Sequence, residues 1–161
     1  MKRAYLLLLL CLVLIFTACT GEKTDYFAPV SGAFCAELHG TYHGMEIAAV
    51  LEVQAPDEAG VREATLRFSE PQTLAGMCVT RAQTGEVSLS VGDICVPTQD
   101  HSFDALLDIF PASGEVTEVV LENGLTRVNG TGFSLFFNKE GTPAAAENAA
   151  ASVTVTRFEK R

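Results

Sequence analysis

The side chains able to do chemistry are few in this sequence, and one group of them lies close together. Cys35, Glu37 and His39 alternate along one segment and share a face if it is extended, with His43 nearby. Ligands of these types on one strand face can hold a metal ion. A solvated polar face beside a turn has the same pattern and needs no ion. We expect the polar face and predict no metal site.

Recognisable catalytic motifs are absent from the sequence. No serine lies in a G-x-S-x-G pattern, and neither H-E-x-x-H nor a phosphate-binding glycine loop occurs. His101 lies one residue before a predicted helix, where a loop or capping role suits it better than the role of a base. We therefore predict no catalytic residue and no cofactor, and we expect a protein that is not an enzyme.

The N-terminus has the pattern of an export signal. Lys2 and Arg3 precede an uncharged apolar run of 13 residues, Ala4–Phe16, whereas a membrane-spanning helix needs about 20. Two small residues and Cys19 follow, and this order resembles a bacterial lipoprotein signal. An ordinary signal peptidase prefers a small residue where bulky Phe16 stands. An ordinary secreted protein, with Cys19 present by chance, is the alternative.

A lipoprotein signal implies that Cys19 is the first mature residue and carries a diacylglycerol thioether. We predict a signal peptide over residues 1–18, the lipidated cysteine and a tether over 19–31, and one domain over 32–161. The protein is then extracytoplasmic and held to the cell membrane by its lipid. Thr20 stands at the position where a lipoprotein retained in the inner membrane would carry Asp. In a cell with two membranes, Thr20 therefore favours the outer membrane.

Size and charge limit the partners of the mature chain. Without residues 1–18 it keeps 143 residues, enough for one ordinary domain. Loss of Lys2 and Arg3 moves the net charge from −9 to −11. An acidic surface repels polyanions, so we expect no nucleic-acid partner. Cys35, Cys78 and Cys95 permit at most one disulfide among them, and their spacing leaves the pair open.

Apolar and polar residues alternate with a period of two along most of the domain. The alternation predicts half-buried antiparallel strands around residues 34–39, 46–54, 63–68, 77–80, 86–91, 119–121, 133–137 and 153–155. Glycine-rich turns separate them, including two Asn-Gly pairs. These pairs, at 123–124 and 129–130, are too close together for both to close long hairpins, so one is expected to be a bulge or loop.

Ser102–Phe110 is predicted to be a helix, because its apolar residues form one stripe and Pro111 prevents its continuation. Ala144–Ala151 is alanine-rich and is a further helix candidate. A long twisted sheet must curl. We therefore expect a mainly β (α+β) fold, a curled antiparallel sheet or unclosed half-barrel of about eight or more strands with a short helix on the concave face.

Three passages resemble the LolA/LolB-like superfamily of unclosed antiparallel barrels. Leu66–Pro71 followed by Leu74–Gly76 is similar to a family strand that ends in Pro and a small-residue turn. Phe133–Pro143 is similar to the near-terminal strand and turn, and Val153–Phe158 to the last strand. The order of elements agrees over about residues 32–159. The resemblance implies a hydrophobic concave face covered by helices, in a group that includes lipoprotein carriers and envelope lipoproteins.

The resemblance also implies that apolar residues of inward parity line an acyl-chain groove. Thirteen residues have this parity: Phe34, Leu38, Ile47, Leu51, Leu66, Phe68, Met77, Leu89, Phe103, Leu106, Phe133, Leu135 and Phe137. The alternative is an ordinary dry core. A short tether does not suit a shuttle, so we expect a membrane-anchored envelope lipoprotein that binds an acyl chain or a lipidated protein in the groove.

The second hypothesis is a non-catalytic interaction scaffold with a filled core. It would be a dimeric envelope protein, or a lipoprotein of the spore-germination type, that pairs with a second copy or an envelope partner through its acidic face or an exposed strand edge.

Fatty-acid labelling tests the assignment of Cys19. Cells grown with a clickable fatty acid should label the wild-type protein and leave Cys19→Ser unlabelled, because the substitution removes the acceptor thiol. The measurement is in-gel fluorescence after the click reaction, with Cys11→Ser as the matched control that keeps full labelling. Equal labelling of wild type and Cys19→Ser would reject the assignment.

Overall fold

The computed structural model describes residues 24–161. Cys19 and the proposed signal peptide lie outside the described residues, so the lipid anchor stays a prediction. Within residues 24–161, no helix is long and apolar enough to cross a membrane. Part of the segment expected to be a tether belongs to the folded domain, because Phe27 and Val30 are buried in its core.

The described chain forms eleven strands and one short helix. The strands are β1 (Phe34–Tyr42), β2 (Met45–Val53), β3 (Ala64–Glu70), β4 (Met77–Arg81), β5 (Val87–Val91), β6 (Ile94–Thr98), β7 (Val116–Glu122), β8 (Leu125–Gly130), β9 (Phe133–Phe137), β10 (Pro143–Asn148) and β11 (Ala151–Lys160). The helix is α2 (Asp104–Leu107).

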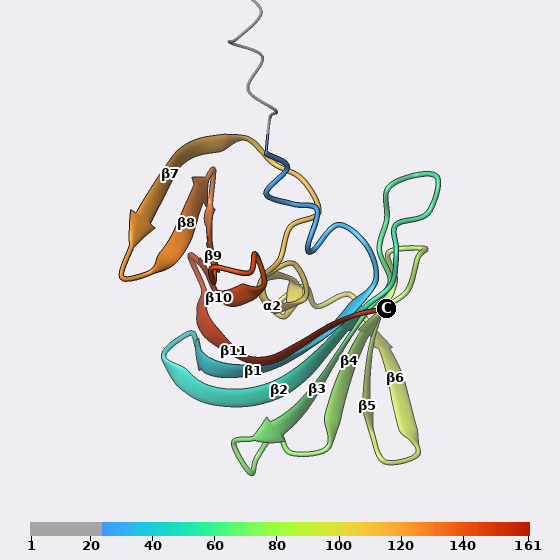
Figure 1. The fold of residues 1–161 in the computed structure, drawn as a ribbon. Helices are drawn as coiled ribbons and strands as arrows, with labels where there is room; N and C mark the ends of the chain where they lie inside the picture. The colour runs from blue at the N-terminus through green and yellow to red at the C-terminus, as the bar shows by residue number, and fades with distance from the viewer. Residues whose placement is uncertain (1–23) are drawn as a thin grey trace, which may run out of the picture.

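All eleven strands form one antiparallel sheet in the order β6-β5-β4-β3-β2-β1-β11-β10-β9-β8-β7. The first six strands are a meander on one side, and the last five are a second meander on the other. The two meanders meet where β1 pairs with β11. The sheet curls around α2, and its edges β6 and β7 lie at opposite ends (Figure 1). The unclosed half-barrel with a helix on its concave side is therefore confirmed.

Residues 144–151 form the end of one strand, a short turn and the start of the next strand, and not a helix. Residues 143–148 make up β10, which is hydrogen-bonded between β9 and β11. Asn148 then fixes the turn into β11, because its Oδ1 accepts hydrogen bonds from the backbone N–H groups of Ala150 and Ala151 at 3.0 and 2.9 Å. Ladder hydrogen bonds on both sides outweigh the helical preference of alanine.

The predicted helix at 102–110 is shorter than expected, because α2 covers only Asp104–Leu107. Side chains of β4 and of the loop between β2 and β3 bind the residues that follow it. Asp108 is bound by Arg81, and the carbonyl of Phe110 accepts a hydrogen bond from Arg62. These tertiary bonds hold the chain in a non-helical path after its first turn.

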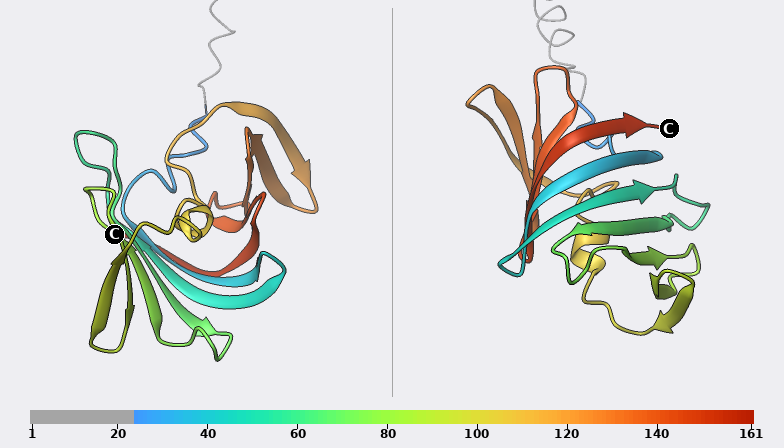
Figure 2. Two further views of the ribbon diagram at one scale, coloured as in Figure 1. Left: turned by 180° about the vertical axis from the view of Figure 1, so that it is seen from behind. Right: turned by 90° about the horizontal axis from the view of Figure 1, so that it is seen from below.

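The concave face is apolar in rows that cross the strands. One row runs over seven strands from β11 to β6, through Phe158, Ala36, Leu51, Leu66, Val79, Leu89 and Val96. Its central members are fully buried, whereas Leu89 is partly buried and Val96 is exposed. Figure 2 shows the curl that brings the central strands around α2 and the N-terminal segment. The core therefore sits over the middle of the sheet.

A substitution at Gly40 tests how closely the backbones of β1 and β11 approach each other. A Cβ at Gly40 would collide with the carbonyl oxygen of Ser152 and lie 2.7 Å from the Cα of Val153. Gly40→Ala should lower the free energy of unfolding by about 1–3 kcal/mol, as overpacking does elsewhere. Gly32→Ala is the control, because a Cβ there meets nothing within 4 Å. Equal denaturant midpoints for the two variants would contradict a close approach of the β1 and β11 backbones at Gly40.

Candidate functional site

The structure brings together all thirteen residues predicted to line a groove. Nine are buried in the core cluster, and four pack against it partly buried. The buried nine are Phe34, Leu38, Ile47, Leu51, Leu66, Phe68, Leu106, Leu135 and Phe137. The partly buried four are Met77, Leu89, Phe103 and Phe133. Eleven of the thirteen lie on strands of the concave face, whereas Phe103 and Leu106 belong to the connection that packs on it.

Side chains of the same chain fill the middle of this face. Leu106, Leu107, Ile109 and Phe110 lie between β6 and β7 in sequence and are at most 1% exposed, and Val30 of the N-terminal segment is fully buried. The ring of Phe110 meets that of Phe34 edge-on, with centroids 5.8 Å apart. We refer to residues 104–110 and Val30 as the cover. Under the cover, the concave face is a packed core.

Polar side chains of the sheet and its loops hold the cover in place. Arg62 is buried and donates from Nη1 to the carbonyl oxygen of Val30 at 2.9 Å and from Nη2 to that of Phe110 at 2.7 Å. The amide of Asn148 donates to the carbonyl oxygen of Ala105 at 2.7 Å. Burial lowers the pKa of the Arg62 guanidinium. A buried charge placed on two backbone carbonyls joins both parts of the cover to the β2–β3 loop.

Arg81 adds a charged contact at the rim of the cover. Its guanidinium binds both carboxylate oxygens of Asp108, at 2.7 and 2.6 Å. This hydrogen bond to Asp108 raises the pKa of Arg81. The Asp108 side chain is half exposed, so solvent screens the pair and its contribution to stability is small. The bidentate geometry nevertheless fixes where the chain leaves α2.

The apolar face is open to solvent toward β6. Val91, Ile94 and Val96 are 58%, 71% and 54% exposed, and they continue the rows of the core across β5 and β6. We call these three residues with Leu89 the β6 wing. A smaller apolar surface is exposed at the other edge, where Val119 and Leu121 of β7 lie on the concave face.

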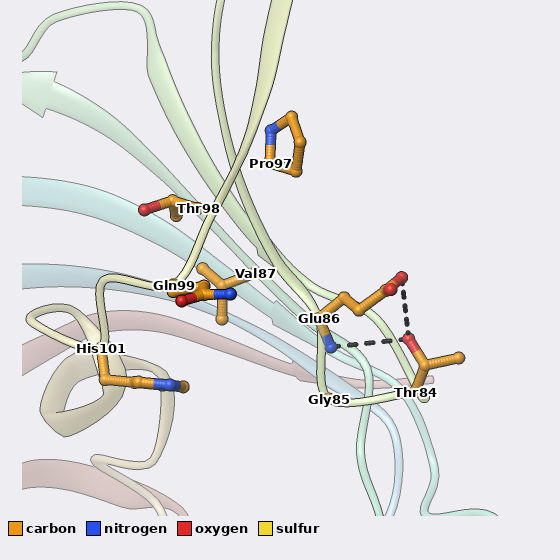
Figure 3. A pocket seen from close by; sticks show the side chains of 8 residues that line it. All are labelled: Thr84, Gly85, Glu86, Val87, Pro97, Thr98, Gln99 and His101. Atoms are coloured by element: carbon orange, nitrogen blue, oxygen red, sulfur yellow. Dashed lines mark hydrogen bonds between the residues drawn. The ribbon is translucent and has the colours of Figure 1, made fainter.

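A cavity of about 590 Å³ borders the β6 wing at the C-terminal end of β6. Its lining residues are Thr84, Gly85, Glu86, Val87, Pro97, Thr98, Gln99 and His101. Figure 3 shows His101 and Gln99 on one side and the Thr84–Glu86 turn on the other, with Val87 between them. This cavity offers polar side chains beside an apolar strip.

The polar residues considered for metal binding or catalysis lie on the convex face of β1, in the turn after it and in the loop before α2. Within residues 24–161, no three His, Cys, Asp or Glu side chains come together in a way that could hold a metal ion. His101 Nδ1 lies 2.9 Å from Asp104 Oδ2, and the His101 side chain is exposed whereas Asp104 is partly buried. Among the described residues, no Ser, Thr or Cys side chain is hydrogen-bonded to His101.

The three cysteines among the described residues, Cys35, Cys78 and Cys95, are free thiols in this structure. Cys78 and Cys95 share one face of the sheet, with Ser90 of β5 directly between them. Two strand spacings separate their Cα atoms by about 10 Å, beyond the reach of a disulfide. Cys35 lies on β1, with β2 and β3 between it and β4. Burial raises the pKa of the Cys35 thiol.

No protein-family model and no curated protein matches this sequence. Solved structures do match. An uncharacterised conserved protein from Thermus thermophilus is 15% identical with a TM-score of 0.52, over 85% of this chain and 84% of that one. MucB is 14% identical with a TM-score of 0.51, over 84% of this chain, which spans 56% of the MucB chain.

A LolA superfamily protein from Nitrosomonas europaea also matches, at 8% identity and a TM-score of 0.44, over 82% of this chain and 87% of that one. This likeness is weaker and adds nothing to the fold assignment. The first two structures share the curled, unclosed sheet with this chain. Together with the topology, they bear out the half-barrel expected from the resemblance seen in the sequence.

Removal of the buried guanidinium tests the role given to Arg62. Arg62→Ala leaves the carbonyls of Val30 and Phe110 without their donors, so the free energy of unfolding should fall by about 2–4 kcal/mol. Amide hydrogens of residues 104–110 should exchange faster by mass spectrometry. Arg67→Ala, on the exposed face of β3, is the matched control with little effect. Unchanged exchange at 104–110 in Arg62→Ala would contradict the role.

Proposed function

We propose that this protein is a membrane-anchored envelope protein that binds a hydrophobic chain, an acyl chain or a lipid attached to a protein, on its concave face. The observation that carries the proposal is the β6 wing. Large apolar side chains stay exposed there, on the face whose central rows form the core. Soluble domains rarely expose contiguous apolar surface without a use for it.

The wing has the shape and chemistry for a chain-like ligand. Residues 94–98 of β6 extend over about 13 Å at the usual strand rise. Neither β5 nor β6 carries a charged residue. Each methylene buried on this surface contributes about 0.8 kcal/mol. The neighbouring cavity, with Gln99 and His101 on one wall, would receive the polar end of the ligand.

The position of the anchor supports a stationary role. The described domain begins at Thr24, five residues after Cys19. Five extended residues span about 17 Å. A domain lipidated at Cys19 would therefore act close to one membrane, as an acceptor or holder of a lipid and not as a shuttle between membranes.

The filled centre of the concave face supports a second candidate, an interaction scaffold. Val30 and residues 106–110 occupy the space that a fully enclosed acyl chain would need. In this candidate the exposed wing contacts a protein and no lipid is bound. The two candidates differ in whether a free fatty-acid probe binds to the wing.

Titration with a fluorescent fatty acid distinguishes them. The wild-type domain should enhance the fluorescence of the probe, and Ile94→Ser should bind about tenfold more weakly, because it removes methylene contacts from the wing. Leu121→Ser is the matched control, since Leu121 is 77% exposed on the same face at the far edge. Absence of binding by the wild type, or equal weakening by both variants, would contradict the proposal.

A further inference from the structure

Within residues 24–161, no strand pairs with the outer edge of β6, and the hairpin fixes the hydrogen-bonding pattern of this edge. A two-residue turn, Gly92-Asp93, joins β5 to β6, with Gly92 at a φ of 57°. In such a hairpin the pair next to the turn, Val91 and Ile94, is hydrogen-bonded, and the pattern then alternates. The backbones of Cys95 and Pro97 therefore point outward, away from β5.

Pro97 restricts what can pair with this edge. It has no N–H group, so Cys95 is the residue of β6 that presents both an N–H and a C=O group outward. A long ladder is not available here. A short, self-complementary contact centred on Cys95 is available, because one residue can exchange both hydrogen bonds with its counterpart in an antiparallel pair.

Charge distinguishes the two edges of the sheet. Residues 87–91 and 94–98 contain no charged side chain, although the whole chain carries a net charge of −9. The other edge strand, β7, carries exposed Glu118 and Glu122. Two copies of this acidic protein would repel each other at β7, whereas the β6 edge lets them approach.

We propose that β6 is a homodimer contact, in which β6 of one copy pairs antiparallel with β6 of a second copy about a two-fold axis at Cys95. Ile94 of each copy then lies opposite Val96 of the other on the concave face. These side chains are 71% and 54% exposed in the single chain, and the contact covers part of that apolar surface. Cys95 lies opposite its counterpart on the convex face.

The arrangement is compatible with the rest of the domain. The start of the described chain lies at the end of the domain remote from β6 (Figure 1). The two-fold axis stands perpendicular to the sheet at β6, so the concave faces of both wings open to the same side. The contact is short, so the dimer should form and separate reversibly with concentration.

Cross-linking through the native cysteines tests the contact in the full-length protein in its membrane. A copper–phenanthroline oxidant should convert the wild type to a covalent dimer, because two Cys95 thiols face each other. Each pair of thiols loses two electrons to the oxidant and two protons to water. Cys95→Ser should give no dimer, and Cys78→Ser, whose thiol lies two strands away, should cross-link like the wild type.

Sedimentation of the purified mature protein, without oxidant, gives an independent readout. The wild type should shift from monomer to dimer with concentration, and Val96→Lys should raise the dimer dissociation constant at least tenfold. Leu121→Lys, which places the same charge at an exposed position of the β7 edge strand, should leave it unchanged. A wild type that stays monomeric at every concentration, or dimers that persist in Val96→Lys, would overturn the proposal. Neither readout depends on whether a lipid binds.

Discussion

The pairing of the first strand with the last is the constraint on which the rest of this structure depends. Each meander is held together by local hairpins, and in the described part of the chain the pairing of β1 with β11 joins the two into one sheet. Gly40 allows the close approach of these two strands. The hydroxyl of Thr154 adds a hydrogen bond to the carbonyl oxygen of His39 at 3.0 Å. We call this β1–β11 pairing the seam. Because it lies in the middle of the strand order, the two edge strands of the described sheet are β6 and β7.

That central seam decides where the apolar face is covered and where it is open. The connection between the two meanders, residues 99–115, must cross the concave side to link β6 to β7. It brings Leu106, Leu107, Ile109 and Phe110 into the middle, where Arg62 and Asn148 hold it. Its buried residues do not cover the apolar side chains of the two edge strands, which stay exposed. The exposed β6 wing is thus a consequence of topology, and it supplies the surface on which both proposed interactions rest.

Strand alternation and inward parity were readable from the sequence, because both follow from the period of a half-buried sheet. β6, β8 and β10 were missed for physical reasons. β8 lies between Gly124 and Gly130, where one of two closely spaced Asn-Gly pairs was expected to be a bulge or loop. Pro97 argues against a strand unless that strand is an edge, and the alanines of β10 favour a helix until β9 and β11 flank them. The short α2 reflects tertiary hydrogen bonds that no local pattern encodes. Arg62 gave no signal either, since its two acceptors lie 32 and 48 residues away.

The most direct test of the central claim, that the concave face binds a hydrophobic chain, is the native mass spectrum of residues 20–161 produced without the lipid anchor. The account predicts adducts in the mass range of lipids that are lost on gentle activation, leaving the mass of the folded domain. A spectrum of the bare domain alone, unchanged after incubation with fatty acid, would contradict it.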